Sequence, residues 1–234
     1  MGEEDAMTAP TLAVIPTKNR PEFLADCVNS LDGQVHGILI VDNGSNPPTS
    51  AFPGLSSDLR IIRHAEYPPN ISRLWNLGID EVARTAETNG WGAWNVLVVN
   101  DDIVAPDELV VTLSAAMRAT TAVCAYPDQF GVGQRMLHTA AQPTLVQERI
   151  CGYCFMLRGE AGIRADEDFV WWFGDDTIDW ESRQAGGSLL VPGVRVEHRA
   201  PDVQTRADPV LSEQTDRDHK TWITKWGYER PVLM

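Results

Sequence analysis

The chain has 234 residues, of which 33 are acidic and 19 are basic, so its formal net charge is −14. This length fits one α/β domain with or without a tail, and the negative charge argues against a broad surface for nucleic acid. Four scattered cysteines favour a reducing compartment, and no apolar run approaches the roughly 18 residues of a membrane span, so we expect a cytoplasmic protein without a membrane segment.

The first half of the chain alternates short apolar runs with amphipathic segments. Residues 1–10 are acidic with little to bury, which predicts a disordered leader. Strands are expected at Thr11–Ile15, Gly37–Val41, Arg60–Arg63 and Val96–Val99, and helices are expected to begin near Pro21, Ile71 and Pro106. The resulting order over residues 11–118 predicts a mostly parallel sheet flanked by helices.

The second half is less regular. We expect strands at Thr121–Tyr126, Gly152–Leu157, Leu189–Val191 and Val194–Val196, and a short helix that ends near Arg183. Residues 127–150 have no clear period, and a loop of that length is usually functional. Residues 200–234 are polar and are predicted as a tail or a lid.

Three acidic strand ends are expected: Asp42, Asp101 with Asp102, and Asp175 with Asp176. Ligand sites in open α/β sheets lie at the carboxyl ends of strands, and adjacent acids repel unless a cation or hydrogen-bond donors separate them. Oxygen ligands suit Mg²⁺ or Mn²⁺, and His198 follows a later apolar piece. The alternative is a set of solvated turns. Cys151 and Cys154 form a CxxC without a second pair, so a buried strand is favoured there over a zinc site.

Five segments resemble, in the same order, those of family-2 glycosyltransferases with the GT-A fold. AVIPTKNRPEFLADCVNSL is similar to the opening strand and helix, ILIVDNGSN to the nucleotide-binding strand, and ISRLWNLGIDEVA to the Arg-containing helix. VVNDDIVAPDEL is similar to the DxD segment, and FGDDTIDWESRQAGG to the acceptor-side acidic motif. The resemblance implies one catalytic domain over residues 11–199, with a nucleotide-sugar-binding half (11–118) and an acceptor-binding half (119–199).

The resemblance also implies a binding site for the donor nucleotide sugar. Thr17 and Asn19 would line the nucleoside pocket, and the Asp42 carboxylate would accept hydrogen bonds from the base. Arg73 would lie near the base or the diphosphate. The full implied set is Pro16, Thr17, Asn19, Arg20, Asp42, Arg73, Asn76, Asn100 and Asp101. Two alternatives are open: Asp42 as the start of an Asx turn, and Arg73 as a helix-surface ion pair.

By the same resemblance, Asp102 and His198 would hold the Mn²⁺ or Mg²⁺ that bridges the two donor phosphates. The sequence departs from the commonest pattern at Asn100, which can bind a ribose hydroxyl but removes one negative charge from the DxD position. His198 as a hydrogen-bonded strand end is the alternative for that residue.

The acidic motif implies that Asp176 is the general base of an inverting transfer, with Asp175 as second choice. Trp171 and Trp172 come just before this pair and would stack on the acceptor. Their alternative role is as core aromatics.

The function implied is transfer of a sugar from a nucleotide sugar, UDP-linked first and GDP- or dTDP-linked next, to a hydroxyl of a small molecule, glycan or protein. A virus-type DNA glycosyltransferase acting on a hydroxymethylated base is an alternative, against which the net charge weighs. A sugar nucleotidyltransferase would carry a Gly- and basic-rich loop after the first strand, and PTKNRP contains no glycine. A non-catalytic sugar-nucleotide-binding module is the remaining alternative.

Overall fold

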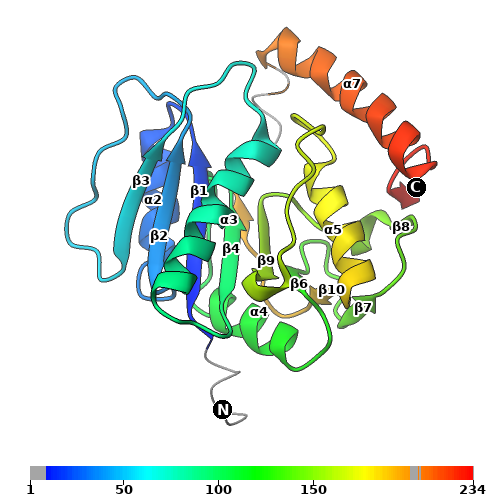
Figure 1. Ribbon diagram of the computed structural model, residues 1–234, viewed down its shortest axis with the longest axis horizontal. Helices are drawn as coiled ribbons and strands as arrows, with labels where there is room; N and C mark the ends of the chain where they lie inside the picture. Colours follow the sequence, from blue (N-terminus) through cyan, green and yellow to red (C-terminus); the bar gives the residue numbers. More distant parts are fainter. Residues whose placement is uncertain (1–8, 201–204, 206, 234) are drawn as a thin grey trace.

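The computed structural model describes residues 9–200, 205 and 207–233, and its centre is an eight-stranded sheet with helices on both faces (Figure 1). Its order is β3-β2-β1-β4-β9-β6-β10-β7. The strands are β1 (Thr11–Thr17), β2 (Gly37–Asp42), β3 (Asp58–Arg63), β4 (Asn95–Val99), β6 (Cys124–Pro127), β7 (Met136–His138), β9 (Cys154–Arg158) and β10 (Ser188–Val191). All run parallel except β9 and β7, which confirms the mostly parallel α/β sheet.

Five α-helices and two minor sheets complete the described fold. The helices are α2 (Pro21–Leu31), α3 (Ile71–Thr88), α4 (Leu109–Arg118), α5 (Gly174–Ala185) and α7 (Pro209–Trp226), with the short 3-10 turns η1 (Val146–Glu148) and η2 (Gly159–Ala161). β5 (Ile103–Val104) pairs with β11 (Glu197–His198), and β8 (Thr144–Leu145) pairs with β12 (Val232–Leu233). None of the described helices is long and apolar enough to cross a membrane.

The sheet is covered by a separate apolar cluster on each face. On one face, α2 and α4 contribute residues such as Leu24 and Leu113. On the other, α3 and α5 contribute residues such as Ile79 and Ile178. A Cβ at Gly78 of α3 would lie 2.2 Å from Cγ1 of Val14, so glycine is what lets α3 approach β1 this closely. The residues of the central strands β1, β2 and β4 are therefore buried on both faces, which explains their continuous apolar runs.

Several predicted boundaries were wrong around the DxD segment. The helix expected at Pro106 begins at Leu109. The residues before it form β5, and the strand expected at Val194–Val196 lies instead at Glu197–His198, where it pairs with β5. This pairing depends on residues far apart in the chain, so local periodicity does not indicate it.

The predicted polar tail contains an 18-residue helix, α7. Asp208 caps it by accepting from the Val210 amide, Pro209 occupies its first turn, and Gly227 ends it in the left-handed conformation at φ 74°. Figure 1 shows α7 along the outside of the molecule, on the α5 side. Residues 1–8 of the predicted leader and 201–204, 206 and 234 of the predicted tail lie outside the described residues.

Candidate active site

The carboxyl ends of β1, β2 and β4 bring polar residues to one edge of the sheet. Thr17 pairs in register with Asp42 of β2, and β4 lies on the other side of β1. The Thr17 hydroxyl donates a 2.7 Å hydrogen bond to Oδ2 of Asp101, which follows β4. Pro16 is buried in β1 beside Val41. The predicted donor-side residues from three different motifs therefore meet at this edge.

Arg20 joins the two acids that follow β4. Its Nη1 lies 2.8 Å from Oδ1 of Asp101, and its Nη2 lies 2.9 Å from Oδ2 of Asp102. Burial raises the pKa of Asp101 to about 6 even though Arg20 and Thr17 favour the charged form. Burial also opposes the charge of Asp102, but His198 and Arg20 outweigh it and lower the pKa of that carboxyl below its ordinary value.

His198 reaches the same acids through the β5–β11 ladder. It pairs with Ile103, and the Arg199 amide donates to the Asp102 carbonyl at 3.0 Å. The ring of His198 stacks on Tyr153 with centroids 4.1 Å apart, which fixes its orientation. Its Nε2 lies 3.3 Å from Oδ1 of Asp102. The structure thus brings together the two residues predicted as metal ligands.

Oδ1 of Asp102 is buried and makes no regular hydrogen bond with the described residues; its contact is the 3.3 Å ion pair with Nε2 of His198. A carboxylate oxygen and an imidazole nitrogen facing each other suit Mn²⁺ or Mg²⁺. Within the described part of the chain, no group of three or more His, Cys, Asp or Glu side chains forms a complete metal site. These two residues fit a metal that takes its other ligands from substrate phosphates and water, as Mg²⁺ commonly does.

Asp42 and Asn19 hold the loop after β2. Asp42 is buried, and its carboxylate accepts hydrogen bonds from the Ser45 and Thr49 amides and from Arg63. Burial opposes its charge, yet these bonds lower its pKa below the ordinary value. Asn19 has φ 55° and accepts a 2.7 Å hydrogen bond from the Asn46 amide. The contacts of Asp42 are therefore those of its alternative role in a turn. A nucleobase that binds to this carboxylate must share it with the loop.

Two predicted residues on α3 contact the segment before the acidic pair. Arg73 is partly exposed and pairs with Glu66 and Glu167, as its ion-pair alternative predicted. Asn76 is buried, and its amide exchanges two hydrogen bonds with the Ala165 backbone and donates to Glu167. Asn76 therefore uses its polar groups to hold this segment and not to contact the Asp101–Asp102 cluster.

Asp175 and Asp176 lie in the first turn of α5, not at the strand end that the sequence predicted. Phe173 precedes the helix in the left-handed conformation with φ 66°. A Cβ at Gly174 would lie 2.4 Å from Oγ of Ser72, so the start of α5 packs directly on α3. This contact fixes the position of the acidic pair, and the helix N-terminus favours negative charge there.

Arg149 neutralises part of the charge of this pair. Its Nη2 lies 3.0 Å from Oδ2 of Asp176 and 3.4 Å from Oδ2 of Asp175. Only 2% of Asp176 is exposed. Burial, together with the neighbouring Asp175 and Asp179, raises the pKa of Asp176 to about 8, although Arg149 opposes the shift. A carboxylate of this kind is a suitable general base near neutral pH.

The segment 149–154 contacts both the acidic pair of α5 and the residues around Asp102. Arg149 binds the acidic pair, and a Cβ at Gly152 would lie 2.9 Å from Oδ2 of Asp175. Tyr153 stacks on His198, and its carbonyl accepts from the Asn100 amide at 3.0 Å. We call these residues the bridging segment. Sequence reasoning missed its roles, and the only signal was the long unpatterned stretch that ends at residue 150.

Trp171 and Trp172 are attached to α7. The backbone amides of both residues donate to Oδ2 of Asp218 at 2.8 Å, and the Val170 amide donates to Oδ1 at 3.2 Å. Nε1 of Trp171 donates to Thr205. Both indoles are partly exposed, so neither belongs to the buried core. Asp218, which sequence reasoning missed, holds the chain just before the acidic pair.

Only the second cysteine of the CxxC lies in the expected buried strand, because β9 begins at Cys154 and Cys151 is partly exposed in the segment before it. All four cysteines are free thiols, and Cys154 is buried in β9 beside Val99. Burial raises the pKa of Cys151 to about 11, which disfavours the reactive thiolate.

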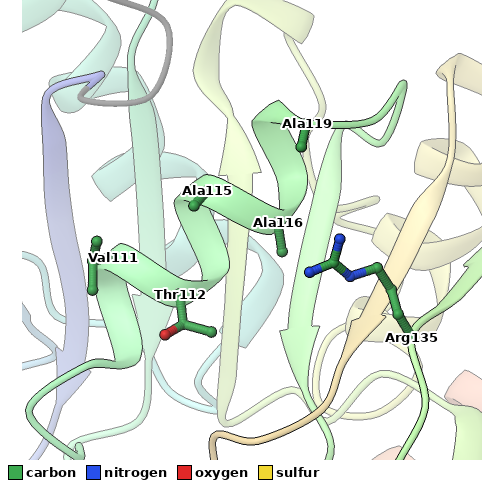
Figure 2. A pocket seen from close by; sticks show the side chains of 6 residues that line it. All are labelled: Val111, Thr112, Ala115, Ala116, Ala119 and Arg135. Carbon is green, nitrogen blue, oxygen red and sulfur yellow. The ribbon is translucent and has the colours of Figure 1, made fainter. Parts of the chain in front are cut away.

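An open groove runs along α4 on the surface. Figure 2 shows its lining of Val111, Thr112, Ala115, Ala116, Ala119 and Arg135. None of the predicted site residues lines it, and it contains no carboxylate or histidine. The candidate active site therefore consists of the sheet edge and the bridging segment, and not of this groove.

The sequence profile described as glycosyl transferase family 2 matches residues 12–149, more than half of the chain. The chain belongs to this family. The match supports glycosyl transfer over nucleotidyl transfer, and this glycosyltransferase carries the family's donor-side segments in their expected order. A comparison with curated proteins gives no significant match.

Solved structures show that this glycosyltransferase has the GT-A fold. Residues 1–349 of TarS from S. aureus superpose with TM-score 0.55 and 12% identity over 93% of this chain and 72% of that one. GalNAc-T7, solved with UDP, GalNAc and Mn²⁺, gives TM-score 0.58 and 15% identity over 82% of this chain and 44% of that one. A longer TarS structure gives TM-score 0.54 with 12% identity over 90% and 42%. The glycosyltransferase thus spans less than half of the latter two chains.

Proposed function

We propose that this glycosyltransferase moves a sugar from a UDP-sugar to an acceptor hydroxyl with inversion at the anomeric carbon. The observation that carries the proposal is the pairing of the buried Oδ1 of Asp102 with Nε2 of His198, 3.3 Å apart at the edge of the sheet. A divalent cation, Mn²⁺ or Mg²⁺, held by these two side chains would offset the negative charge of the departing nucleoside diphosphate. UDP and Mn²⁺ are supported by the structural likeness to GalNAc-T7, which was solved with both.

The nucleoside would occupy the edge formed by Thr17, Asn19 and the loop after Asp42. Arg20, Asn100 and Asp101 lie next to it and would bind the ribose and the diphosphate. Arg73 would have to leave Glu66 or Glu167 to reach the nucleotide, because both acids occupy its guanidinium in the free protein. We propose that the Arg73 side chain moves to contact the donor when the donor binds.

Asp176 would act as the general base. It takes the proton of the acceptor hydroxyl while that oxygen bonds to the anomeric carbon, and the carbon–oxygen bond to the diphosphate breaks with its electron pair. Attack opposite the leaving group inverts the centre. Asp175 is the second choice because its side chain is the more exposed of the two, at 16% against 2%.

The acceptor would meet the bridging segment, residues 127–150 and the partly exposed Trp171 and Trp172. A small molecule, a glycan or a protein fits this proposal. A hydroxymethylated base in DNA is disfavoured by the net charge of −14. We also propose a cytoplasmic location, because the four cysteines are free thiols.

Thermal unfolding with UDP-, GDP- and dTDP-sugars, each with Mn²⁺ and with EDTA, tests the donor site. A ligand that binds only the folded state adds about 2.7 kcal/mol at one hundred times its Kd. We expect a UDP-sugar to raise Tm with Mn²⁺ and to lose most of this effect in EDTA. An equal rise in EDTA would contradict the metal, and a rise with only GDP- or dTDP-sugars would contradict the choice of uridine.

The Asp176→Asn variant tests the chemistry separately from binding. It should keep the donor-induced rise in Tm and lose transfer, or slow donor hydrolysis, by about 10²-fold or more, which is the usual contribution of a general base. Release of UDP, followed by chromatography, measures both reactions. Equal rates in the variant and the parent would remove Asp176 as the base.

A further inference from the structure

Arg20 occupies an unusual place for a residue of a donor site, because its guanidinium bridges two buried carboxylates. One nitrogen lies 2.8 Å from Asp101 and another lies 2.9 Å from Asp102, while the acids themselves are 4% and 2% exposed. The guanidinium carbon also lies 4.8 Å from the centroid of the Phe23 ring, a cation–π contact. A fixed positive charge is therefore already present beside the proposed metal ligands.

The charges around Arg20 leave little net attraction for a divalent cation in addition to the guanidinium. The commonest first residue of the motif is an acid, but here it is the neutral Asn100, so Asp101 and Asp102 supply the negative charge. Arg20 compensates one of these two charges. A divalent cation at Oδ1 of Asp102 would sit close to this guanidinium, which holds the other oxygen of the same carboxylate.

The protein ligands alone are also too few to hold the metal. Oδ1 of Asp102 and Nε2 of His198 are two ligands, and the described residues provide no third His, Cys, Asp or Glu for a complete site. A nucleoside diphosphate supplies the missing metal ligands through its phosphate oxygens. Its negative charge also attracts both the divalent cation and the Arg20 guanidinium. A guanidinium binds phosphate oxygens well for the same reason.

We propose that Arg20 makes metal binding conditional on the donor, so that the divalent cation binds weakly to the free enzyme and tightly only together with the nucleoside diphosphate. The proposal rests on the donor site described under the proposed function. Arg20 would contact the nucleoside diphosphate. It would also be a positioning residue, because it links the binding of the diphosphate to the binding of the divalent cation. Thermodynamic linkage requires that the metal tighten nucleotide binding by the same factor by which the nucleotide tightens metal binding.

Titration of Mn²⁺ by electron paramagnetic resonance measures this coupling directly, because the signal of the free ion reports the bound fraction without any turnover. Four proteins are compared, each with and without UDP: the parent, Arg20→Met, Arg20→Lys and the control Arg84→Met. Arg84 pairs with Glu81 on the exposed face of α3, outside the site. Thermal unfolding checks that each variant is folded.

In the parent and the control, UDP should tighten Mn²⁺ binding by about tenfold or more. In Arg20→Met, Mn²⁺ without UDP should bind about tenfold tighter than in the parent, the order expected for removal of one charge a few ångströms away. The effect of UDP should shrink by a similar factor. Arg20→Lys keeps the charge and should keep most of the coupling.

Two results would overturn the proposal: unchanged Mn²⁺ affinity without UDP in a folded Arg20→Met, or equally tight Mn²⁺ binding to the parent with and without UDP. Failure of the proposed function looks different. In that case UDP would not bind to the parent at any Mn²⁺ concentration, as measured by calorimetry with UDP alone and with UDP plus Mn²⁺.

Discussion

Asp176 is a buried carboxylate whose surroundings disfavour its charge. Its burial and the like charges of Asp175 and Asp179 raise its pKa to about 8, and the single guanidinium of Arg149 offsets only part of this effect. A general base must be ionised to accept a proton. The same environment that would make Asp176 a stronger base, in the role proposed for it, would therefore restrict its activity to alkaline and near-neutral solution.

We expect kcat/KM for transfer to rise with pH and to reach half of its plateau at about pH 8, because the fraction of ionised Asp176 increases through its pKa. In Asp175→Asn the loss of a neighbouring negative charge lowers the pKa of Asp176, so the rise should move to lower pH. Initial rates from pH 6 to 9.5 measure both profiles. If Asp175→Asn abolished transfer instead, Asp175 would be the base.

The same shift links stability to pH. The carboxyl of Asp176 has a pKa of about 8 in the folded protein and an ordinary value of 3.8, so the folded state holds a proton that the unfolded chain releases between these values. Its contribution is thus fully present below pH 3.8 and is lost as pH rises through 8.

We expect Tm of the parent to fall more steeply between pH 6 and 9 than Tm of Asp176→Asn, whose amide does not titrate. Calorimetry of both proteins in matched buffers makes the comparison. Parallel Tm curves would show that the folded protein does not protonate this carboxyl. The difference between the curves is the informative quantity, because groups distant from Asp176 titrate alike in both proteins.

At the scale of single elements, helix α7 packs against α5 and the residues that precede it. Trp222 is fully buried against Trp180 of α5 with ring centroids 4.8 Å apart, and it stacks on Phe173 at 5.6 Å. Phe173 immediately precedes the helix that carries the acidic pair. Helix α7 therefore supports the acceptor side through its aromatic contacts and through Asp218.

Truncation of Trp222 should destabilise the protein strongly. We expect Trp222→Ala to lower the free energy of unfolding by about 3–5 kcal/mol, the usual cost of removing a large buried aromatic side chain. The matched control is Ile223→Ala, the next residue of α7, which is 43% exposed and should change stability little. Urea unfolding measures both variants. Similar small effects would mean that α7 is not part of the cooperative fold.

Helix α7 also shows why part of this fold escaped prediction from the sequence. Its buried face has only four residues, and two of them, Gln214 and Asp218, are polar. Amphipathic periodicity was therefore weak, although the Asp208–Pro209 start and the Gly227 stop were readable. The strands β1, β2 and β4 were predictable for the opposite reason, because burial on both faces makes their sequences continuously apolar.

For the molecule as a whole, the proximity of candidate site residues was predictable where neighbouring strands carry them. It was not predictable where irregular segments distant in the sequence meet. Thr17, Arg20, Asp101 and Asp102 meet because parallel strands end at one edge, and the motif order gave His198 as their partner. The contacts of Arg149 and Tyr153 depend on the path of an irregular segment, which no local pattern specifies.

The pairing of β5 with β11 has a consequence for the order in which the site is completed. Asp102 belongs to the first half of the chain and His198 to its last fifth, and a two-residue ladder is what joins them. During synthesis on the ribosome, the donor-side sheet can form while His198 is still absent. Under the proposed function, metal-dependent donor binding would therefore report that a nascent or truncated chain has paired β5 with β11, whereas secondary structure alone would not.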